Sequence, residues 1–210
     1  MEAVSYRNRI KTNPVVAEKY LFRKQHKHER EIKLVQYTFS RIKDAETLLD
    51  APCGAGRMSF LAEKAGFKTT GIDLGDAILD CAKSEKLRLN SKVNFLKEDL
   101  ENLSFSDNAF EASLCFRFFH HLPSEKAKMK VISELTRVSS KYVVISYFSA
   151  FSITSIKRKF KSILNISNKQ NATRLTELED YFNKFGFVLH DHKFSMPFFH
   201  TLCIAVFKKY

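Results

Sequence analysis

Four polar side chains follow apolar segments of the chain, at the points where strands are expected to end. They are Asp50, Asp73, Asp99 and Arg117. Carboxylates accept hydrogen bonds from hydroxyl and amino groups and attract cations, whereas a guanidinium group binds carboxylate or phosphate. Strand ends are often polar, so one such residue alone would mean little. Their regular recurrence indicates that they belong to one ligand site.

A parallel sheet is the structure that would bring these four residues together. From residue 47 onward, short apolar runs alternate with helical patterns, which implies βαβ crossovers and helices on both faces of the sheet. Ligands of such sheets bind at the carboxyl ends of the strands. The strands are expected at 47–50, 67–73, 93–96, 110–116, 141–147, 187–194 and 202–208, and the helices at 15–43, 56–65, 75–87, 123–138 and 176–185.

The segment after the first strand carries the strongest local motif. It reads L-L-D-A-P-C-G-A-G-R and places Gly54 and Gly56 between a strand and a helix. Glycines there permit tight turning and close approach of a ligand beside a helix N-terminus. The segment is neither G-x-G-x-x-G nor a P-loop. The acid Asp50 beside this turn suits a cationic ligand better than a pyrophosphate, and a plain strand–helix turn is the alternative.

Two further acids have the spacing of nucleoside contacts. Asp73 comes 23 residues after Asp50, where an acid can accept hydrogen bonds from both ribose hydroxyls of a nucleoside. Asp99 can accept a hydrogen bond from an exocyclic amine of a base. A loop or N-cap acid is the alternative reading of Asp99, since Glu98 and Asp107 lie nearby.

The ordered motifs L-L-D-A-P-C-G-A-G-R, T-G-I-D-L, K-E-D-L and F-R-F-F-H-H-L-P resemble those of class I S-adenosylmethionine-dependent methyltransferases. The resemblance covers about residues 45–150. It implies a three-layer α/β/α sandwich whose seven-stranded, mostly parallel sheet has the order 3-2-1-4-5-7-6, with the last strand antiparallel. S-adenosyl-L-methionine is the cofactor that it implies.

The resemblance also assigns cofactor-binding residues. Asp50, Gly54 and Gly56 would face the amino-acid part of the cofactor. The remaining assignments are Asp73 with Leu74 for the ribose, Asp99 with Leu100 for the adenine, and Phe116 for the cofactor and acceptor side.

Pro52 departs from the family pattern, which usually has glycine at this place in the loop. Proline removes a backbone donor and fixes φ, so the loop loses some of the conformations that glycine allows. We still include Pro52 among the cofactor-binding residues. A protein that holds the cofactor without transferring a methyl group is the alternative that this departure leaves open.

Residues after the fourth strand are candidates for catalysis. A hydroxyl acceptor benefits from a general base, and histidine suits that role near neutral pH. We expect His120 to contact the acceptor and His121 to be structural. Arg117 could hold a carboxylate or phosphate of the acceptor.

The two ends of the chain are expected to select the acceptor. Residues 1–44 are interpreted as a helical lid and residues 45–210 as the methyltransferase domain, with a basic amphipathic insertion at about 151–174. In that insertion an apolar stripe accompanies a lysine-rich face, which is typical of contact with an anionic membrane or partner. A cover helix packed on the core is the alternative.

Composition limits the remaining classes. The 210 residues carry a net charge of +12, of which the last 60 residues, with 10 basic and 4 acidic side chains, hold +6. No apolar run reaches the roughly 20 residues that span a bilayer, and the N-terminal stretch lacks the apolar region of a secretion signal. The four cysteines are scattered without a C-x-x-C pair, which predicts a cytoplasmic protein without a disulfide framework or zinc site.

Three functions remain in competition. The first is a methyltransferase acting on a small-molecule, lipid-linked or cell-envelope sugar acceptor, with peripheral contact at the inner membrane surface. The second is an RNA or protein methyltransferase. The net charge of +12 favours this function, whereas the lack of an N/D-P-P-Y motif after the fourth strand argues against it. The third is the non-catalytic cofactor-binding protein. No metal is expected in any of them.

Overall fold

The computed structural model describes residues 25–150, 171–195 and 202–210. Its strands are β1 (Thr47–Asp50), β2 (Lys68–Asp73), β3 (Asn94–Lys97), β4 (Phe110–Cys115), β5 (Ser139–Phe148), β6 (Phe187–Phe194) and β7 (Leu202–Lys209). Its helices are α2 (Gln25–Phe39), α3 (Arg57–Lys64), α4 (Asp76–Leu89), η3 (Phe119–His121), α5 (Glu125–Val138) and α7 (Leu175–Asn183).

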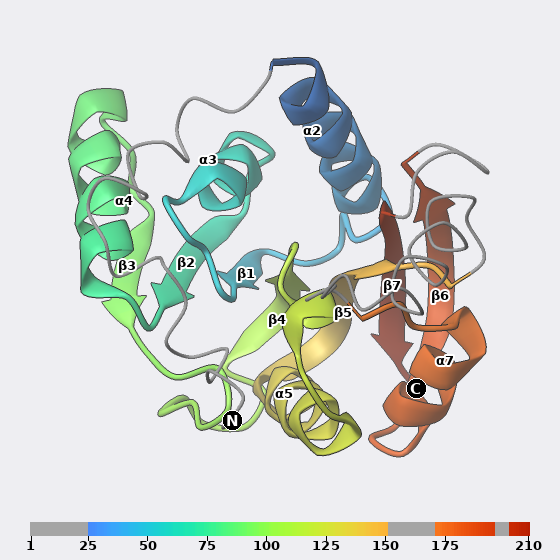
Figure 1. Cartoon of the computed structure of the whole chain (residues 1–210). Coiled ribbons are helices and arrows are strands. Elements are labelled where there is room, and N and C mark those ends of the chain that lie inside the picture. Colours follow the sequence, from blue (N-terminus) through green and yellow to red (C-terminus); the bar gives the residue numbers. More distant parts are fainter. Residues whose placement is uncertain (1–24, 151–170, 196–201) are drawn as a thin grey trace, which may run out of the picture.

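The strands form one sheet in the order β3-β2-β1-β4-β5-β7-β6 (Figure 1). Strands β3, β2, β1, β4 and β5 are parallel to one another, while β7 runs antiparallel to both β5 and β6. This topology confirms the predicted fold class and strand order. The carboxyl ends of β1, β2, β3 and β4 consequently lie along one edge of the sheet.

Helices cover both faces of the sheet (Figure 1). Helices α2, α3 and α4 lie on one face, where apolar residues of α2 and α3 pack with Leu48, Val144 and Ile204 of the strands. Helices α5 and α7 lie on the other face and bury their apolar sides against Val143 and Phe207. Both faces of the central strands are therefore buried, as expected of a parallel sheet.

Two predicted segments lie partly outside the residues that the structure describes. The expected helix at 15–43 is described as α2 from Gln25, because residues 1–24 lie outside the described part. Most of the predicted basic insertion at 151–174 also lies outside it. Within the described ranges, no helix combines the length and apolarity that crossing a membrane requires.

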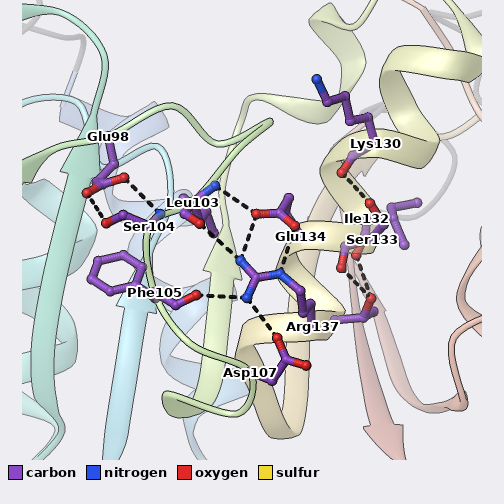
Figure 2. A network of polar contacts seen from close by, with 11 residues as sticks. Glu98, Leu103, Ser104, Phe105, Asp107, Lys130, Ile132, Ser133, Glu134 and Arg137 are labelled. Atoms are coloured by element: carbon purple, nitrogen blue, oxygen red, sulfur yellow. Dashed lines mark hydrogen bonds and ion pairs between the residues drawn. The ribbon is translucent and has the colours of Figure 1, made fainter.

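Arg137 at the end of α5 fastens the loop between β3 and β4 to that helix (Figure 2). Its guanidinium donates to both carboxylate oxygens of Glu134 at 2.8 and 2.9 Å and to Asp107 at 2.9 Å. It also donates to the carbonyl oxygens of Phe105 and Leu103 at 2.7 and 3.1 Å. These contacts raise the pKa of Arg137, with the hydrogen bond to Glu134 as the largest cause.

Replacing Arg137 by alanine is expected to lower the free energy of unfolding by about 2 kcal/mol, because two loop carbonyls and two carboxylates lose a charged donor together. Urea denaturation of the variant measures this loss. The matched control is Arg88→Ala, which removes an exposed pair with Glu85 within α4 and should change stability by less than about 0.5 kcal/mol. Equal effects of the two substitutions would contradict the account.

Candidate functional site

The loop between β1 and α3 begins as an extension of the sheet. The N–H of Ala51 donates to the carbonyl of Leu114 at 2.9 Å, and that of Cys53 donates to Ile72 at 2.6 Å. The chain then turns through Gly54 and Gly56, whose φ angles of 57° and 79° lie in the left-handed region. Glycine adopts this region without steric cost, so the two glycines of the motif allow the turn into α3.

Asp73, at the end of β2, holds this loop in place. One carboxylate oxygen accepts the N–H of Gly54 at 2.9 Å, and the other accepts the N–H of Gly75 at 3.2 Å. The side chain is buried, with the residue 7% exposed. The carboxylate therefore joins the loop after β1 to the loop after β2, which the motif spacing alone does not reveal.

Gly56 is also required by packing beneath the loop. A Cβ atom at this position would lie 2.6 Å from Cζ of Phe95 and 3.0 Å from Cε2 of Phe60. These two rings pack edge to face, with their centroids 5.5 Å apart. Any larger residue at position 56 would push on a packed aromatic pair as well as strain its own backbone.

A cleft of about 380 Å³ opens beside the glycine loop. That volume lies within the roughly 300–1,000 Å³ of small-molecule sites. Predicted site residues in its wall are Asp50, Pro52, Gly54, Phe116 and Arg117. Asp50 is almost fully buried there and accepts a hydrogen bond from the hydroxyl of Ser59 at 2.6 Å.

Other predicted residues stand apart from the cleft wall. Among the described residues, that wall does not include Asp73, Leu74, Asp99 or Leu100. Leu100 is buried in the core beneath the sheet, and Leu74 is 41% exposed. The Asp99 carboxylate accepts the N–H of Glu101 at 3.0 Å, which is the loop-acid geometry that the sequence left open as an alternative.

Arg117 reaches the cleft from the end of β4 with an unusual backbone. Its φ is 57°, and its N–H donates to the hydroxyl of Ser146 at 2.6 Å. Its guanidinium lies 2.5 Å from one oxygen of Glu31, and that of Arg57 lies 2.5 Å from the other oxygen. Glu31 itself is only 2% exposed. One carboxylate of α2 thus bridges two arginines that line the cleft.

Sequence reasoning did not identify Glu31 as a site residue. A signal for it exists, because Glu31 falls on the same helical face as the buried residues Leu34, Val35 and Thr38. An acid in a buried stripe requires a cationic partner. The identity of that partner is not readable from the pattern.

His120 lies in the interior. It is 0% exposed, its ring stacks on Phe148 with centroids 3.8 Å apart, and the ring of His121 lies 4.0 Å away. Its carbonyl accepts the N–H of Asn171 at 2.8 Å. His120 is not in the described wall of the cleft. The structure therefore places Arg117, and not His120, beside that cavity.

A second polar pair lies near the same edge of the sheet, between β5 and β6. The hydroxyl of Tyr147 and Nε2 of His192 are 2.8 Å apart. Burial raises the pKa of Tyr147 and lowers that of His192, although the nearby Asp191 acts in the opposite direction on the histidine. Burial also raises the pKa of the Cys203 thiol to about 12. These three groups are therefore neutral at pH 7.

A metal centre was not expected. In the part of the chain that the structure describes, no group of three or more histidine, cysteine, aspartate or glutamate side chains has a geometry suited to a metal ion.

Comparison with known proteins gives a family match over the site-bearing segment. Residues 48–141 match a family model described as "Methyltransferase domain". The ubiquinone biosynthesis O-methyltransferase of Nitrosospira multiformis is 32% identical over 91 residues, covering 43% of this chain and 38% of that protein. The protein of the same name from Coxiella burnetii is 27% identical over 117 residues, covering 56% and 46%. The chain spans less than half the length of these two relatives.

Solved structures share the fold at low sequence identity. A magnesium protoporphyrin IX methyltransferase from Synechocystis, crystallised with bound SAH, has a TM-score of 0.74 at 16% identity and covers 86% of this chain and 84% of its own. An S-adenosylmethionine-dependent methyltransferase from Clostridium acetobutylicum has a TM-score of 0.73 at 11% identity and covers 94% and 99%. These structures share the fold of this chain, and the family match agrees with the resemblance to methyltransferases.

Substituting Gly56 by alanine is expected to lower the free energy of unfolding by about 2–4 kcal/mol, because left-handed strain adds to the contact with Phe95. Chemical denaturation provides the measurement. Gly66→Ala is the control, since Gly66 also has a positive φ, 101°, but an added Cβ meets nothing within 4 Å. If the two variants lose equal stability, the contact with Phe95 does not determine which residue position 56 can accept.

The lowered pKa of His192 predicts a loss of stability on acidification. The unfolded chain binds a proton near pH 6.5, whereas the folded chain binds it only at a lower pH. The contribution of His192 is therefore complete above pH 6.5 and falls as the pH drops from 6.5 through the folded pKa. Melting curves between pH 7.5 and 5 should show a smaller pH dependence in His192→Gln than in the parent, and an unchanged dependence would refute the assignment.

Proposed function

We propose that this chain, which belongs to the class I S-adenosylmethionine-dependent methyltransferases, transfers a methyl group to a small-molecule, lipid-linked or cell-envelope sugar acceptor. The observation that carries the proposal is the buried Asp73 carboxylate holding the glycine loop beside the cleft. When bound, S-adenosylmethionine supplies an activated methyl group on a sulfonium. The protein must then bind, orient and shield the reactants from water.

The described residues fit this cofactor. Asp50 is a buried carboxylate in the cleft wall, as a ligand with a cationic part requires, and Arg57 and Arg117 bring guanidinium groups that suit a ligand carboxylate. Asp73 is a buried carboxylate that accepts the N–H groups of Gly54 and Gly75, and carboxylate oxygens also accept hydrogen bonds from hydroxyl groups. Ribose hydroxyls are the donors that we assign to this acid.

Roles for the other residues follow from the same orientation of the cofactor. Gly54, Gly56 and Pro52 shape the loop that faces the amino-acid part. Phe116 lines the path toward the acceptor. We assign the adenine to the region of Leu74, Asp99 and Leu100, where Leu74 is the exposed apolar side chain.

A small acceptor is favoured over a macromolecule by the relatives, which are named as O-methyltransferases of ubiquinone biosynthesis. Arg117 is our candidate for contact with the acceptor, because it borders the cleft. The buried, stacked ring of His120 favours a positioning role for this residue over direct proton transfer. Membrane contact through 151–174 remains a proposal that rests on the charge pattern of the sequence.

Asp73→Asn is expected to weaken binding of S-adenosylhomocysteine at least tenfold, because an amide offers one acceptor oxygen where two donors and the ribose hydroxyls require two. Isothermal titration measures the change. Asp80→Asn alters an exposed acid on the following helix and should bind as the parent does. Parent-like binding by Asp73→Asn would contradict the assigned role.

The class of the acceptor is tested by incubating the protein with S-adenosylmethionine labelled on its transferable methyl group and with a fractionated extract of the source cells. Label in the lipid, glycan or small-molecule fraction, absent with Asp73→Asn, would support the proposal. Label in RNA or protein would replace it with the macromolecular alternative. Cofactor binding without transfer to any fraction would favour the non-catalytic reading.

A further inference from the structure

The loop after β4 carries three neighbouring residues of the cleft wall, which are Phe116, Arg117 and Phe118. It continues directly into the η3 turn, Phe119–His121. Arg117 has a φ of 57°, and a residue other than glycine keeps such a backbone only where its surroundings hold it. The position of this part of the wall therefore depends on contacts that the loop makes with other elements.

Hydrogen bonds hold this loop at both of its ends. At its start, the N–H of Arg117 donates to the hydroxyl of the buried Ser146 on β5 at 2.6 Å. At its end, the side-chain amide of Asn171 donates to the carbonyl oxygen of Leu122 at 2.6 Å. The N–H of Asn171 donates to the carbonyl oxygen of His120 at 2.8 Å. One residue thus binds two carbonyl groups at the turn that closes the loop.

Asn171 makes these contacts from a segment that is anchored elsewhere. The N–H of Thr173 donates to the carbonyl oxygen of Phe148 at 2.8 Å, and Thr173 also forms an isolated parallel bridge with Ser149. The hydroxyl of the buried Thr173 accepts a hydrogen bond from the ammonium group of Lys128 on α5 at 3.1 Å. The segment is therefore fixed to β5 and α5 by contacts that do not involve the loop after β4.

The same segment links two parts of the chain that we associate with the acceptor. Residues 171–174 are the described part of the insertion that the sequence predicts at about 151–174, and we expect this insertion to select the acceptor. Arg117, in the loop after β4, is our candidate for contact with the acceptor. The hydrogen bonds of Asn171 join the end of the insertion to that loop. Of these bonds, the one from the side-chain amide can be removed by substitution.

We propose that Asn171 is a positioning residue for the acceptor, whose side-chain amide holds the η3 turn and thereby keeps Arg117 and Phe118 in the arrangement that binds the acceptor. Asn171 is not in the described wall of the cleft, so it acts through the loop. The glycine loop is held by Asp73, so cofactor binding should not depend on Asn171. This inference rests on the proposed function, because it deepens the description of the same site.

The experiment uses the full chain, and its probe is the fraction of the cell extract that the parent labels with the methyl group of S-adenosylmethionine. Asn171→Ala removes the side-chain donor. Half-maximal labelling should then require about threefold to tenfold more of the fraction, which is the range that the loss of one hydrogen bond produces. Binding of S-adenosylhomocysteine should stay within about twofold of the parent.

Asn171→Asp is a second variant, which keeps the shape of the side chain but places a carboxylate oxygen where the amide donates to the carbonyl oxygen of Leu122. Two acceptor oxygens repel each other. Asn171→Asp should therefore be impaired at least as much as Asn171→Ala, again without a change in the binding of S-adenosylhomocysteine. A role in packing alone would give the opposite order, because aspartate fills the same space as asparagine.

Thr173→Val is the matched control on the same segment. It removes the hydroxyl that accepts from Lys128 but keeps the side-chain amide of Asn171. It should lower the melting temperature and leave the half-saturating amount of the fraction within about twofold of the parent. Hydrogen exchange provides a further measurement, since the amides of residues 117–122 should exchange faster in Asn171→Ala than in Thr173→Val.

Parent-like labelling by both Asn171 variants would overturn the proposal. An equal loss with Thr173→Val, or an equal weakening of S-adenosylhomocysteine binding by the Asn171 variants, would also overturn it and leave Asn171 with a structural role only. A parent that binds S-adenosylhomocysteine but labels no fraction would instead refute the proposed function. The exchange rates would in that case still show whether Asn171 holds the turn.

Discussion

The hydrogen bond from Gly54 to the carboxylate of Asp73 is the interaction on which the site depends. Neighbouring parallel strands end at one edge of the sheet, but their loops need a further contact to take one arrangement. A single buried acid supplies it by accepting one N–H from each of two loops. Because an unpaired buried carboxylate is unfavourable, the loop after β1 and the acid after β2 stabilise each other.

Packing of aromatic side chains beneath the loop between β1 and α3 also favours the conformation of this loop. Phe60 and Phe95 occupy the space that a side chain at Gly56 would need. Helix α2 packs against α3, and two carboxylates, Glu31 on α2 and Asp191 on β6, attach this helix to the rest of the protein. Glu31 contacts arginines that belong to the cleft, whereas Asp191 contacts residues of α2 from the far strand of the sheet. Helix α2 is therefore attached both to arginines of the cleft wall and to the far strand of the sheet.

The sequence predicted the part of this structure that depends on local patterns. Apolar runs predicted the strands to within a few residues. The glycine motif located the loop after β1, because a turn depends on the types of a few adjacent residues. The strand order came from the resemblance to a family, since periodicity does not determine which strands become neighbours. Contacts such as Glu31 to Arg117 join residues far apart in the chain, so no local pattern contains them. The burial of His120 follows from the short η3 turn and its stacking on Phe148, which the spacing of the residues does not predict.

A crystal structure of the chain with S-adenosylhomocysteine would test the central claim most directly. The account predicts both ribose hydroxyls within about 2.5–3.2 Å of the Asp73 carboxylate, with the amino-acid part along Gly54. A nucleoside bound away from Asp73 would contradict it.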